Sequence, residues 1–399
     1  MQITFFRLML LVLIITEILS FFVLKEFILR YSKTGFIVLL PLHLAFSIWL
    51  WIAFIRVKTW DGFFDTLENI YNEMIFNGLL IAVLLNRILI ICLHYLGKLL
   101  RKRSRSYIES LTAAGFISAS VYFIILASGF LKGRFNFQTE QITIEIEDLK
   151  KELDGFRIVH IADLHLSGFC NHNKELTEAI EIINGLDPDM IINSGDFVSY
   201  GWREYDNFDT ILIKATSKYG NFAVLGNHDM GTYLPDHNKE TLNLNSLRLK
   251  ELISSSGYTL LENEYSLIKT GKCKIAVIGV KTGGSHPNII HSDINSIIKN
   301  IDSANLKIMI CHDPNQWKED IAGKTDIDIT LSGHSHGMQM GVITRNFRWS
   351  TAKYLYPQWN GLFSEDNQYH YVNRGAGVLS VPFRIWMPPE ITLITLKAG

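Results

Sequence analysis

Four long apolar runs occupy the first third of the chain. Each is close in length to the roughly 20 residues with which an α-helix crosses a bilayer, and four such runs in succession are atypical of a soluble core. The runs are Phe5–Leu24, Gly35–Ile55, Ile75–Gly97 and Leu111–Leu131. No small-x-small cleavage site follows the first run, so we expect a retained span and not a signal peptide. The pattern therefore predicts an all-α transmembrane domain of four helices over residues 1–132.

Shorter apolar stretches follow after Gly133. FNFQTEQITIEIEDL alternates apolar and polar residues, which is typical of a half-exposed strand, whereas FRIVHIAD and DMIINSGD are more apolar, as buried strands are. KELTEAIEIINGL has helical spacing and a glycine near its end. Further strands are predicted by NFAVLGNHD, KIAVIGV, KIMICHD, DIDITLSGH, YHYVNRG and EITLITLK. Because strands alternate with helices, residues 133–399 are expected to form an α/β domain.

The charge balance changes at the same boundary. Residues 1–135 hold 14 basic and 7 acidic side chains, and the remainder holds 24 and 32, which gives the chain its net charge of −1. A net acidic second half without a basic stripe is not suited to nucleic acid, because that binding depends on cationic side chains that replace counterions. We therefore expect no nucleic-acid partner. The lipid bilayer is the partner that the first half predicts.

Lysine and arginine in the short loops predict the orientation of the helices. The loop KLLRKRSRSY after the third run is strongly basic, and the loop after the first run carries Lys25, Arg30 and Lys33. Basic loops stay in the cytoplasm, so both termini and the α/β domain are predicted to be extracytoplasmic. Lys132 and Arg134, just after the fourth run, favour the opposite arrangement, and a cytoplasmic domain is kept as the alternative.

Two ionisable residues, Glu17 and Arg87, interrupt the first and third apolar runs. Charged groups at such positions are costly and are usually paired or functional. We expect the two side chains to pair across the helices in a structural role, and a part in transport is the alternative.

Polar side chains collect where five of the predicted strands end. Ligands of α/β sheets bind beyond the carboxyl ends of the strands, so the five clusters are expected to converge. They are Asp163–His165, Gly195–Asp196, Gly226–Asp229, His312–Asp313 and Gly333–His336. Side chains two residues apart in extended backbone point the same way, as His334 and His336 would. Carboxylate, imidazole and amide oxygen together suit Mn, Fe or Zn, so the sequence predicts a site for two divalent metal ions.

The same motifs resemble the calcineurin-like metallophosphoesterase superfamily. The matching residues are DLH at 163–165, GD at 195–196, GNHD at 226–229, His312 and GHSH at 333–336. The likeness covers residues 135–399 and includes YVNRGAG at 371–377 and PPEITLITL at 388–396, which look like the bacterial membrane-associated branch. That branch contains phosphodiesterases and relatives of UDP-2,3-diacylglucosamine hydrolase. The resemblance implies a four-layer αββα sandwich with the site above the strand ends.

The resemblance also implies a role for each matching residue. It gives one metal ion to Asp163, His165 and His336, gives the second to Asn227, His312 and His334, and makes Asp196 the bridge between them. His228 would stand over the substrate as proton donor or charge stabiliser, and Asp229 would orient it. The second motif departs from the family's GDxxD because Ser199 occupies its last position, which puts the hydrogen bonding around the ligands in doubt.

These features together predict a membrane-anchored, metal-dependent phosphoesterase. By the resemblance, hydroxide activated by two metal ions attacks the phosphorus of a phosphodiester or pyrophosphate bond, and the membrane anchor favours a lipid-linked or envelope substrate. Arg374 and His172 are candidates for substrate contact, and a structural salt bridge is an equal alternative for Arg374. Two other functions stay open: a phosphomonoesterase or nucleotidase with the same ligands, and a non-catalytic membrane protein that only binds ligand.

Overall fold

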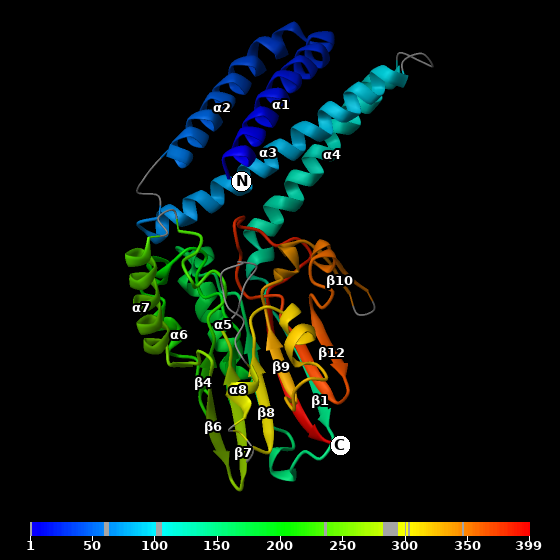
Figure 1. The fold of residues 1–399 in the computed structure, drawn as a ribbon. Helices are drawn as coiled ribbons and strands as arrows, with labels where there is room; N and C mark the ends of the chain where they lie inside the picture. The colour runs from blue at the N-terminus through cyan, green and yellow to red at the C-terminus, as the bar shows by residue number, and fades with distance from the viewer. Residues whose placement is uncertain are drawn as a thin grey trace. The chain divides into compact units, whose positions relative to one another are not determined.

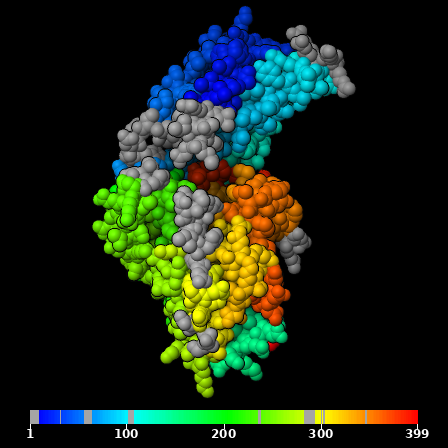
Figure 2. Space-filling model, in the orientation of Figure 1, coloured from blue at the N-terminus to red at the C-terminus, as the bar shows by residue number. Residues whose placement is uncertain are grey.

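The chain forms two compact units in the computed structural model (Figure 1; Figure 2). The first comprises Met1–Phe63 and Asn72–Phe130, and the second comprises Phe64–Tyr71 and Leu131–Gly399. The structure describes residues 2–59, 64–100, 106–234, 238–281, 294–299, 301, 304–344 and 347–399. A short segment at the start of the third helix thus belongs to the second unit, which the sequence pattern did not indicate. The domain boundary expected between residues 132 and 133 stays a prediction.

Four helices supply the first unit. They are α1 (Gln2–Tyr31), α2 (Lys33–Thr59), α3 (Leu67–Leu100) and α4 (Ser106–Leu131). Within the part of the chain that the structure describes, three stretches are long and apolar enough to cross a membrane, namely Lys33–Ile55, Leu67–Leu100 and Tyr107–Phe135. The prediction of four spans is therefore corrected to three candidate spans.

The reason for this correction lies in the charges of α1. From residue 10 to the end of that helix, every stretch of span length contains the three charged side chains of Glu17, Lys25 and Glu26. Charged groups near the centre of a bilayer are costly. The side chains of residues 2–9, which the predicted first span includes in part, lie outside the described residues.

The expected pair between Glu17 and Arg87 is confirmed. Arg87 Nη1 lies 2.6 Å from Glu17 Oε2 and links α3 to α1. Ser47 of α2 donates its hydroxyl to Glu17 Oε1 at 2.5 Å, and His43 Nε2 lies 3.3 Å from the same oxygen. Side chains from three helices therefore compensate the charge inside the apolar bundle, which is a structural role.

Two six-stranded mixed sheets form the frame of the second unit. In spatial order, the first contains β1 (Gln138–Ile146), β14 (Glu390–Ala398), β2 (Arg157–Ile161), β3 (Met190–Asn193), β4 (Asn221–Ala223) and β5 (Tyr258–Leu260). The second contains β12 (Gly361–Glu365), β13 (Gln368–Val372), β9 (Ile329–Ser332), β8 (Leu306–Ile310), β7 (Cys273–Gly279) and β6 (Glu264–Thr270). β2 to β5 are parallel in the first sheet, and β7, β8, β9 and β13 are parallel in the second.

Helices and short turns connect these strands. The α-helices are α5 (Asn173–Gly185), α6 (Asp209–Leu212), α7 (Lys239–Ser255) and α8 (Ile294–Ile298), and a small hairpin pairs β10 (Gly341–Ile343) with β11 (Arg348–Ser350). The single turns are η1 (Gly133–Phe135), η2 (Lys151–Leu153), η3 (Leu166–Phe169), η4 (Trp202–Tyr205), η5 (Trp317–Ile321), η6 (His336–Gln339) and η7 (Thr351–Tyr354). The predicted α/β domain with its alternation of strands and helices is confirmed.

Buried apolar side chains cover both faces of each sheet. In β2, Ile158 packs between the sheets with Ile308 of β8, whereas its neighbour Val159 packs on the outer face with Leu176 of α5. In β8, Met309 packs on the outer face of the second sheet beside α8. Because alternate residues of a strand point to opposite faces, strands that are covered on both faces are apolar throughout. Helices α5, α6 and α7 therefore cover one sheet, and α8 covers the other.

Candidate metal centre

The loops after β2, β3, β4, β8 and β9 bring the five predicted clusters together. Several loop residues adopt a left-handed backbone, namely Asp163 (φ 52°), His165 (41°), Asp196 (58°), His334 (71°) and His336 (50°). This conformation is uncommon for residues with a side chain and costs on the order of 1–3 kcal/mol each. All five are predicted metal ligands, so the backbone strain is concentrated where side chains must be aimed at one point.

Four side chains form a closed group that we call the inner cluster. The ligand atoms of Asp163, His165, Asp196 and His336 lie within 4.8 Å of one another, and all four residues are buried. Nε2 of His165 is 3.1 Å from Nε2 of His336. Asp163 Oδ1 is 3.6 Å from the same nitrogen of His336. The inner cluster therefore offers two imidazoles and two carboxylates to one small volume.

A second group, the outer cluster, shares Asp196 with the first. Its ligand atoms come from Asp196, His312 and His334 and also lie within 4.8 Å of one another. Asn227 joins them, since its Oδ1 is 3.1 Å from His312 Nε2. Asp196 Oδ2 lies 3.1 Å from His312 Nε2 and 3.7 Å from His165 Nε2. One carboxylate thus reaches both clusters.

The imidazoles turn one nitrogen inwards and the other outwards. His312 Nδ1 donates to the carbonyl oxygen of Ser194 at 2.8 Å; because a carbonyl only accepts, the neutral ring keeps its lone pair on Nε2, inside the cluster. His334 Nε2 is 2.8 Å from the Tyr356 hydroxyl, and its Nδ1 faces His312 Nε2 at 3.2 Å. Outer hydrogen bonds of this kind orient metal-binding histidines. The donor set therefore fits divalent ions at the inner nitrogens.

Electrostatics in the centre favour a cation. Burial lowers the pKa of His165 to about 3 and that of His334 to about 4, so both rings are neutral at pH 7. Burial also opposes a charge on His312, but without a bound cation the Asp196 carboxylate outweighs it and raises the pKa of His312 to about 10, so a metal ion at Nε2 would have to replace a proton there. Burial likewise opposes the charge of Asp196, yet His312 and His228 hold its pKa well below the usual range. An ionised carboxylate therefore stands between the two clusters.

Residues 156–338 match the family described as calcineurin-like phosphoesterase. The match contains the loops of both clusters. This part of the chain is therefore similar to the calcineurin-like phosphoesterases. After this similarity we call the second unit the phosphoesterase unit, and its buried histidines and carboxylates could hold divalent metal ions.

Known proteins that resemble the chain include the uncharacterized metallophosphoesterase YkuE of Bacillus subtilis, which is 29% identical over 274 residues, 65% of this chain and 86% of that protein. A transmembrane protein with metallophosphoesterase domain from Danio rerio is 26% identical over 317 residues, 77% of this chain and 68% of that protein. Because residues 133–399 are fewer than 77% of the chain, this second match extends into the helical unit. The three candidate spans and this relative together support membrane association. A crystal structure of a metallophosphoesterase from Sphaerobacter thermophilus is 18% identical, covers 56% of this chain and 77% of that one, and has a TM-score of 0.26.

His228 stands beside both clusters of the phosphoesterase unit, because its ring lies 5.1 Å from that of His165 and its backbone N–H donates to Asp196 Oδ1 at 2.9 Å. Its Nδ1 is 2.6 Å from the carbonyl oxygen of Ser199, and because a carbonyl only accepts, Nδ1 carries the proton of that bond. The ring of Tyr233 stacks on the imidazole with 4.2 Å between centroids. These two contacts fix the ring and leave Nε2 as the nitrogen available to a ligand.

Asp229 does not orient His228, and that prediction is corrected. Its carboxylate accepts the backbone N–H groups of Asp196 at 2.8 Å, Gly226 at 2.9 Å and Val198 at 3.1 Å. Three donors on one buried carboxylate tie the loop after β3 to the loop after β4. Asp229 therefore positions the backbone that carries Asp196 and does not contact the imidazole.

Gly226 permits a close approach between these same loops. A Cβ atom at this residue would lie 2.1 Å from Asp196 Oδ1, a distance that no packing tolerates. Any side chain there would displace the carboxylate that both clusters share. The glycine of the GNHD motif is therefore required by the space beside Asp196.

Ser199 resolves the doubt about the second motif. Its hydroxyl is 3.1 Å from His165 Nδ1, on the outer side of that ring, and 3.0 Å from the Ser167 hydroxyl. Its carbonyl oxygen holds His228. One serine thus supports the imidazole of His165, in the inner cluster, and the neighbouring imidazole of His228.

The two predicted substrate contacts lie elsewhere in the phosphoesterase unit. Arg374 is buried, with Nη1 2.8 Å from Glu390 Oε2 and 3.0 Å from Glu140 Oε1, so it forms the structural salt bridge that was the alternative. His172 Nε2 is 3.0 Å from Arg134 Nη2. Neither Arg374 nor His172 lines the cavity over the clusters. Both predictions are corrected, because each side chain is engaged with a charged partner away from that cavity.

A cavity of about 390 Å³ opens over the two clusters. The residues that line it are Asp196, Asn227, His228, Tyr233, His334, Ser335, His336, Met338, Gln339, Tyr356, Leu379, Ser380 and Val381. Sequence reasoning named the candidate ligands and His228 among them, and it missed the apolar and aromatic wall. Met338 and Tyr233 follow the fifth and third motifs closely, and this nearness was the available signal; Tyr356 and Leu379 had none.

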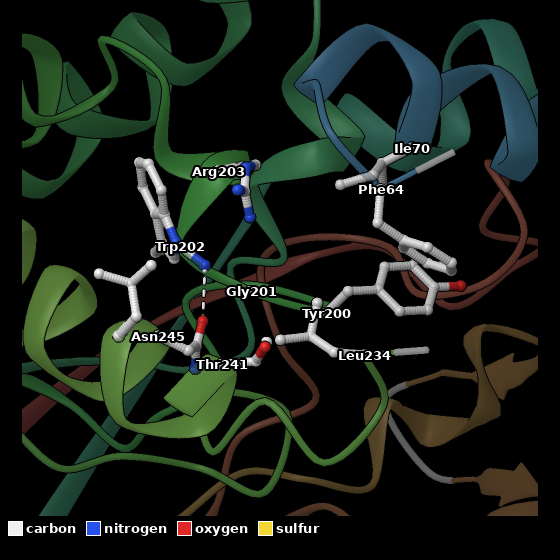
Figure 3. A pocket seen from close by; sticks show the side chains of 10 residues that line it. Phe64, Ile70, Tyr200, Gly201, Trp202, Arg203, Leu234, Thr241 and Asn245 are labelled. Carbon is white, nitrogen blue, oxygen red and sulfur yellow. Dashed lines mark hydrogen bonds between the residues drawn. The ribbon is translucent and has the colours of Figure 1, made fainter. Parts of the chain in front are cut away.

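A smaller pocket of about 90 Å³ lies where Phe64 and Ile70 meet the loop that follows Ser199 (Figure 3). The rings of Phe64 and Tyr200 pack edge to face with 4.8 Å between centroids. In the same pocket the backbone N–H of Trp202 donates to Asn245 Oδ1 at 2.9 Å. Residues at the start of α3 therefore help to hold the loop whose serine supports His165 and His228.

Proposed function

We propose that the protein is a membrane-anchored hydrolase of phosphodiester or pyrophosphate bonds that uses two divalent metal ions. The observation that carries the proposal is a single carboxylate, that of Asp196, placed 3.1 Å from His312 Nε2 and 3.7 Å from His165 Nε2, so that it joins two ligand clusters. Paired metal sites of phosphatases and nucleases use a shared ligand in this way to hold their ions about 3.5–4 Å apart.

The residues divide into two ligand sets. Asp163, His165 and His336 would hold the inner ion, Asn227, His312 and His334 would hold the outer one, and Asp196 would serve both. Oxygen and imidazole ligands suit Mn, Fe or Zn. Bound ions supply Lewis acidity toward the phosphoryl oxygen and toward the attacking water. The chain's own part is to fix the distance between the ions and to exclude other water through the buried inner cluster.

His228 serves as the proton donor in this proposal. With Nδ1 held by the Ser199 carbonyl at 2.6 Å, the ring can deliver a proton only from Nε2. A donor placed at the leaving oxygen contributes typically about 10²–10⁴ in rate.

The lining of the cavity supports a diester over a monoester. None of the described residues that line it is lysine or arginine, whereas a monoester dianion is usually met by additional cations. Met338, Leu379 and Val381 offer apolar surface instead. A substrate with an organic group on each side of the phosphate fits this combination.

The phosphoesterase unit is placed outside the cytoplasm in the proposal. The basic loop between α3 and α4 carries Lys98, Arg101, Lys102, Arg103 and Arg105, and it favours the cytoplasmic side. One candidate span separates this loop from the phosphoesterase unit, whatever the state of α1. The start of α3 belongs to the phosphoesterase unit, as does the chain after α4. This fits a topology in which α3 and α4 each cross the membrane once. Arg134, which favoured the opposite side, is buried and donates to the Tyr71 hydroxyl at 3.0 Å, so it is part of the fold and not of a basic loop.

The test uses the full chain purified in detergent. Bound metal is measured by plasma mass spectrometry, and hydrolysis of bis-p-nitrophenyl phosphate is measured with Mn²⁺. We expect two ions per chain and a metal-dependent activity. Asp196→Asn should lose metal and activity together, whereas His228→Ala should keep both ions and lose about 10²–10⁴ in kcat.

The matched control is Asp206→Asn, an exposed aspartate outside both clusters, which should change neither metal content nor rate. Absence of bound metal in the wild type, or full activity in Asp196→Asn, would overturn the proposal. Two bound ions with hydrolysis of p-nitrophenyl phosphate alone would overturn the diester assignment and leave the metal centre in place.

A further inference from the structure

Large apolar side chains are exposed beside the cavity of the phosphoesterase unit. We call Phe347, Trp349, Tyr354, Leu355 and Trp386 the apolar rim. Tyr354 is 73% exposed, Trp386 65% and Leu355 62%. Residues near 350, orange in Figure 2, gather on one face of the phosphoesterase unit. A single exposed apolar residue is ordinary, but several large ones together mark an interaction surface.

Hydrogen bonds join the segments of the rim to one another and to the cavity. The β10–β11 pairing holds the hairpin that carries Phe347 and Trp349. The Gly341 N–H donates to the Ile385 carbonyl at 3.1 Å, which places Trp386 beside the start of β10. On the other side, Leu355 precedes Tyr356, which lines the cavity. The rim is therefore continuous with the mouth of the candidate active site.

Trp386 is presented to solvent on an unusual backbone. Its φ of 51° lies in the left-handed region, which is a genuine outlier for a bulky residue. Such strain persists only where the surrounding structure imposes it and is common at sites that bind something. The Ile385 N–H donates to the Gln339 carbonyl at 2.9 Å, so the strained residue is anchored to the loop of the fifth motif.

The charge around the rim differs from that of the rest of the unit. No aspartate or glutamate occurs between Asp328 and Glu365 in the sequence, whereas the described part of this stretch contains Arg348 and Lys353. Lys353 Nζ lies 5.0 Å from the ring centre of Tyr354 and 5.9 Å from that of Trp349. The remainder of the chain after residue 135 has more acidic than basic residues. The rim is thus a cationic and aromatic area on an acidic unit.

We propose that the apolar rim docks on a bilayer that contains anionic lipids. Trp and Tyr are enriched at the headgroup level of membranes, and each lysine or arginine near an anionic surface adds attraction. The chain's own candidate spans keep a bilayer within reach of the unit. Docking brings the mouth of the cavity to the lipid surface, which names membrane-borne phosphoesters as the substrate class; this last step rests on the proposed function, and the docking itself does not.

Docking is tested with the full chain in vesicles and a polarity-sensitive fluorophore on Tyr354→Cys. Cys92 is replaced by serine in this chain, because it is exposed and the other three cysteines are buried. In phosphatidylcholine vesicles with added phosphatidylglycerol, we expect a blue-shifted emission that grows with the anionic fraction and is quenched by lipids brominated near the headgroup. The matched control is Leu247→Cys on α7, since Leu247 is 63% exposed and lies outside the rim.

Equal emission from the labels at residues 354 and 247 in anionic vesicles overturns the proposal. A blue shift at residue 354 that grows with the number of protein molecules per vesicle, and not with the fraction of anionic lipid, also overturns the proposal. In that case a second copy of the chain covers the rim. Neither readout requires catalysis. Failure of docking and failure of the proposed hydrolase are therefore observed separately.

The contribution of a single cation of the rim to docking is tested by neutralising Lys353. Lys353→Gln, introduced into the labelled chain, should weaken the docking equilibrium about fivefold. Lys272→Gln, at the exposed β6–β7 turn, is its control and should leave the equilibrium as it was. An equal response to the two substitutions contradicts a docking site at the rim.

Discussion

Buried histidines occur both inside the sheets and at their edge, and the two settings differ in what the rings face. Inside, His160 of β2 lies 3.0 Å from the Ser194 hydroxyl and His370 of β13 lies 2.9 Å from the Ser332 hydroxyl. At the edge, His165 and His336 face each other with 3.1 Å between their Nε2 atoms. Burial lowers the pKa of His160, His370 and His165 alike, to about 3.

This comparison separates burial from function. An interior histidine forms its hydrogen bonds within the fold, as His370 does with Gln358 and Ser332, and its backbone is regular strand. At the edge, His165 and His312 use Nδ1 for a hydrogen bond to the fold and direct Nε2 at a shared point, and the backbone of His165 is left-handed. The direction of the free nitrogen, and not the depth of the residue, therefore distinguishes a candidate ligand from a core residue.

The largest effect should follow from removing an edge histidine. His336→Ala deletes a ligand of the inner cluster, and we expect loss of bound metal and a fall in kcat/KM of more than roughly 10⁴, beyond the loss of a proton donor alone. Without metal the fold should not suffer, because no hydrogen bond of the core is lost. Metal content, rate and the unfolding temperature in chelator are the measurements. Two ions retained in the variant would contradict the division of roles.

A smaller effect is expected from the outer hydrogen bond of an edge histidine. Ser199→Ala removes the hydroxyl that lies 3.1 Å from His165 Nδ1. Partners of this kind contribute about 10–100-fold in metal affinity or activity. Titration of the apo-protein with Mn²⁺ measures the affinity, and Ser255→Ala, an exposed serine on α7, is the control. An unchanged affinity would show that the loop holds His165 without the hydroxyl.

Tyr356→Phe should affect only one of the two clusters. Its hydroxyl is 2.8 Å from His334 Nε2, on the outer cluster, and makes no contact with the inner one. We expect about tenfold weaker binding of one ion. This is the lower end of such effects, because the hydroxyl lies in the wall of the open cavity. Stepwise titration resolves the two ions. A weakening of both ions by the same factor would contradict the assignment of His334 to the outer set.

The smallest effect on activity should come from an interior histidine. Burial lowers the pKa of His370 to about 3 in the folded chain, whereas a histidine in the unfolded chain has a pKa of about 6.5. As the pH falls from about 6.5 towards 3, this ring is therefore protonated in the unfolded chain and not in the folded one. Stability is therefore lost through that window, by at most about 1.4 kcal/mol per pH unit for this ring. His370→Gln should flatten the slope and leave the rate per folded molecule close to that of the wild type. The free energy of unfolding, measured from pH 7 to pH 4, checks this.

The same distinction explains how much the sequence predicts. The central strands, from β2 to β4 and from β7 to β9, were predicted because both faces are buried and the residues are apolar throughout. β5, β6 and β10 to β12 were missed, since they are short or lie at sheet edges, where polar and apolar residues carry no clear period. In the first unit, apolar length alone suggested four spans, and the charges of α1 reduce the candidates to three.

At the site, residues in motifs were predictable and residues brought near by folding were not. The seven candidate ligands stand directly at strand ends, so their convergence followed from the parallel order of the strands. Tyr356 is 22 residues from His334, which it contacts, and no local sequence pattern predicts this contact. Asp229, His172 and Arg374 were assigned roles from their positions in the chain, but the directions of their side chains depend on partners far away in sequence.

The segment Phe64–Tyr71 has a consequence for anyone who divides this protein. The chain enters the phosphoesterase unit at Phe64–Tyr71, continues in the first unit through most of α3 and α4, and returns to the phosphoesterase unit at Leu131. A truncated chain that begins at residue 133 would lack Phe64, the ring that packs on Tyr200, and Tyr71, the phenol that accepts from Arg134. Residues 133–399, which the hydropathy pattern outlines as one domain, are therefore not the whole phosphoesterase unit. The segment Phe64–Tyr71, which lies between apolar stretches in the sequence, also belongs to it.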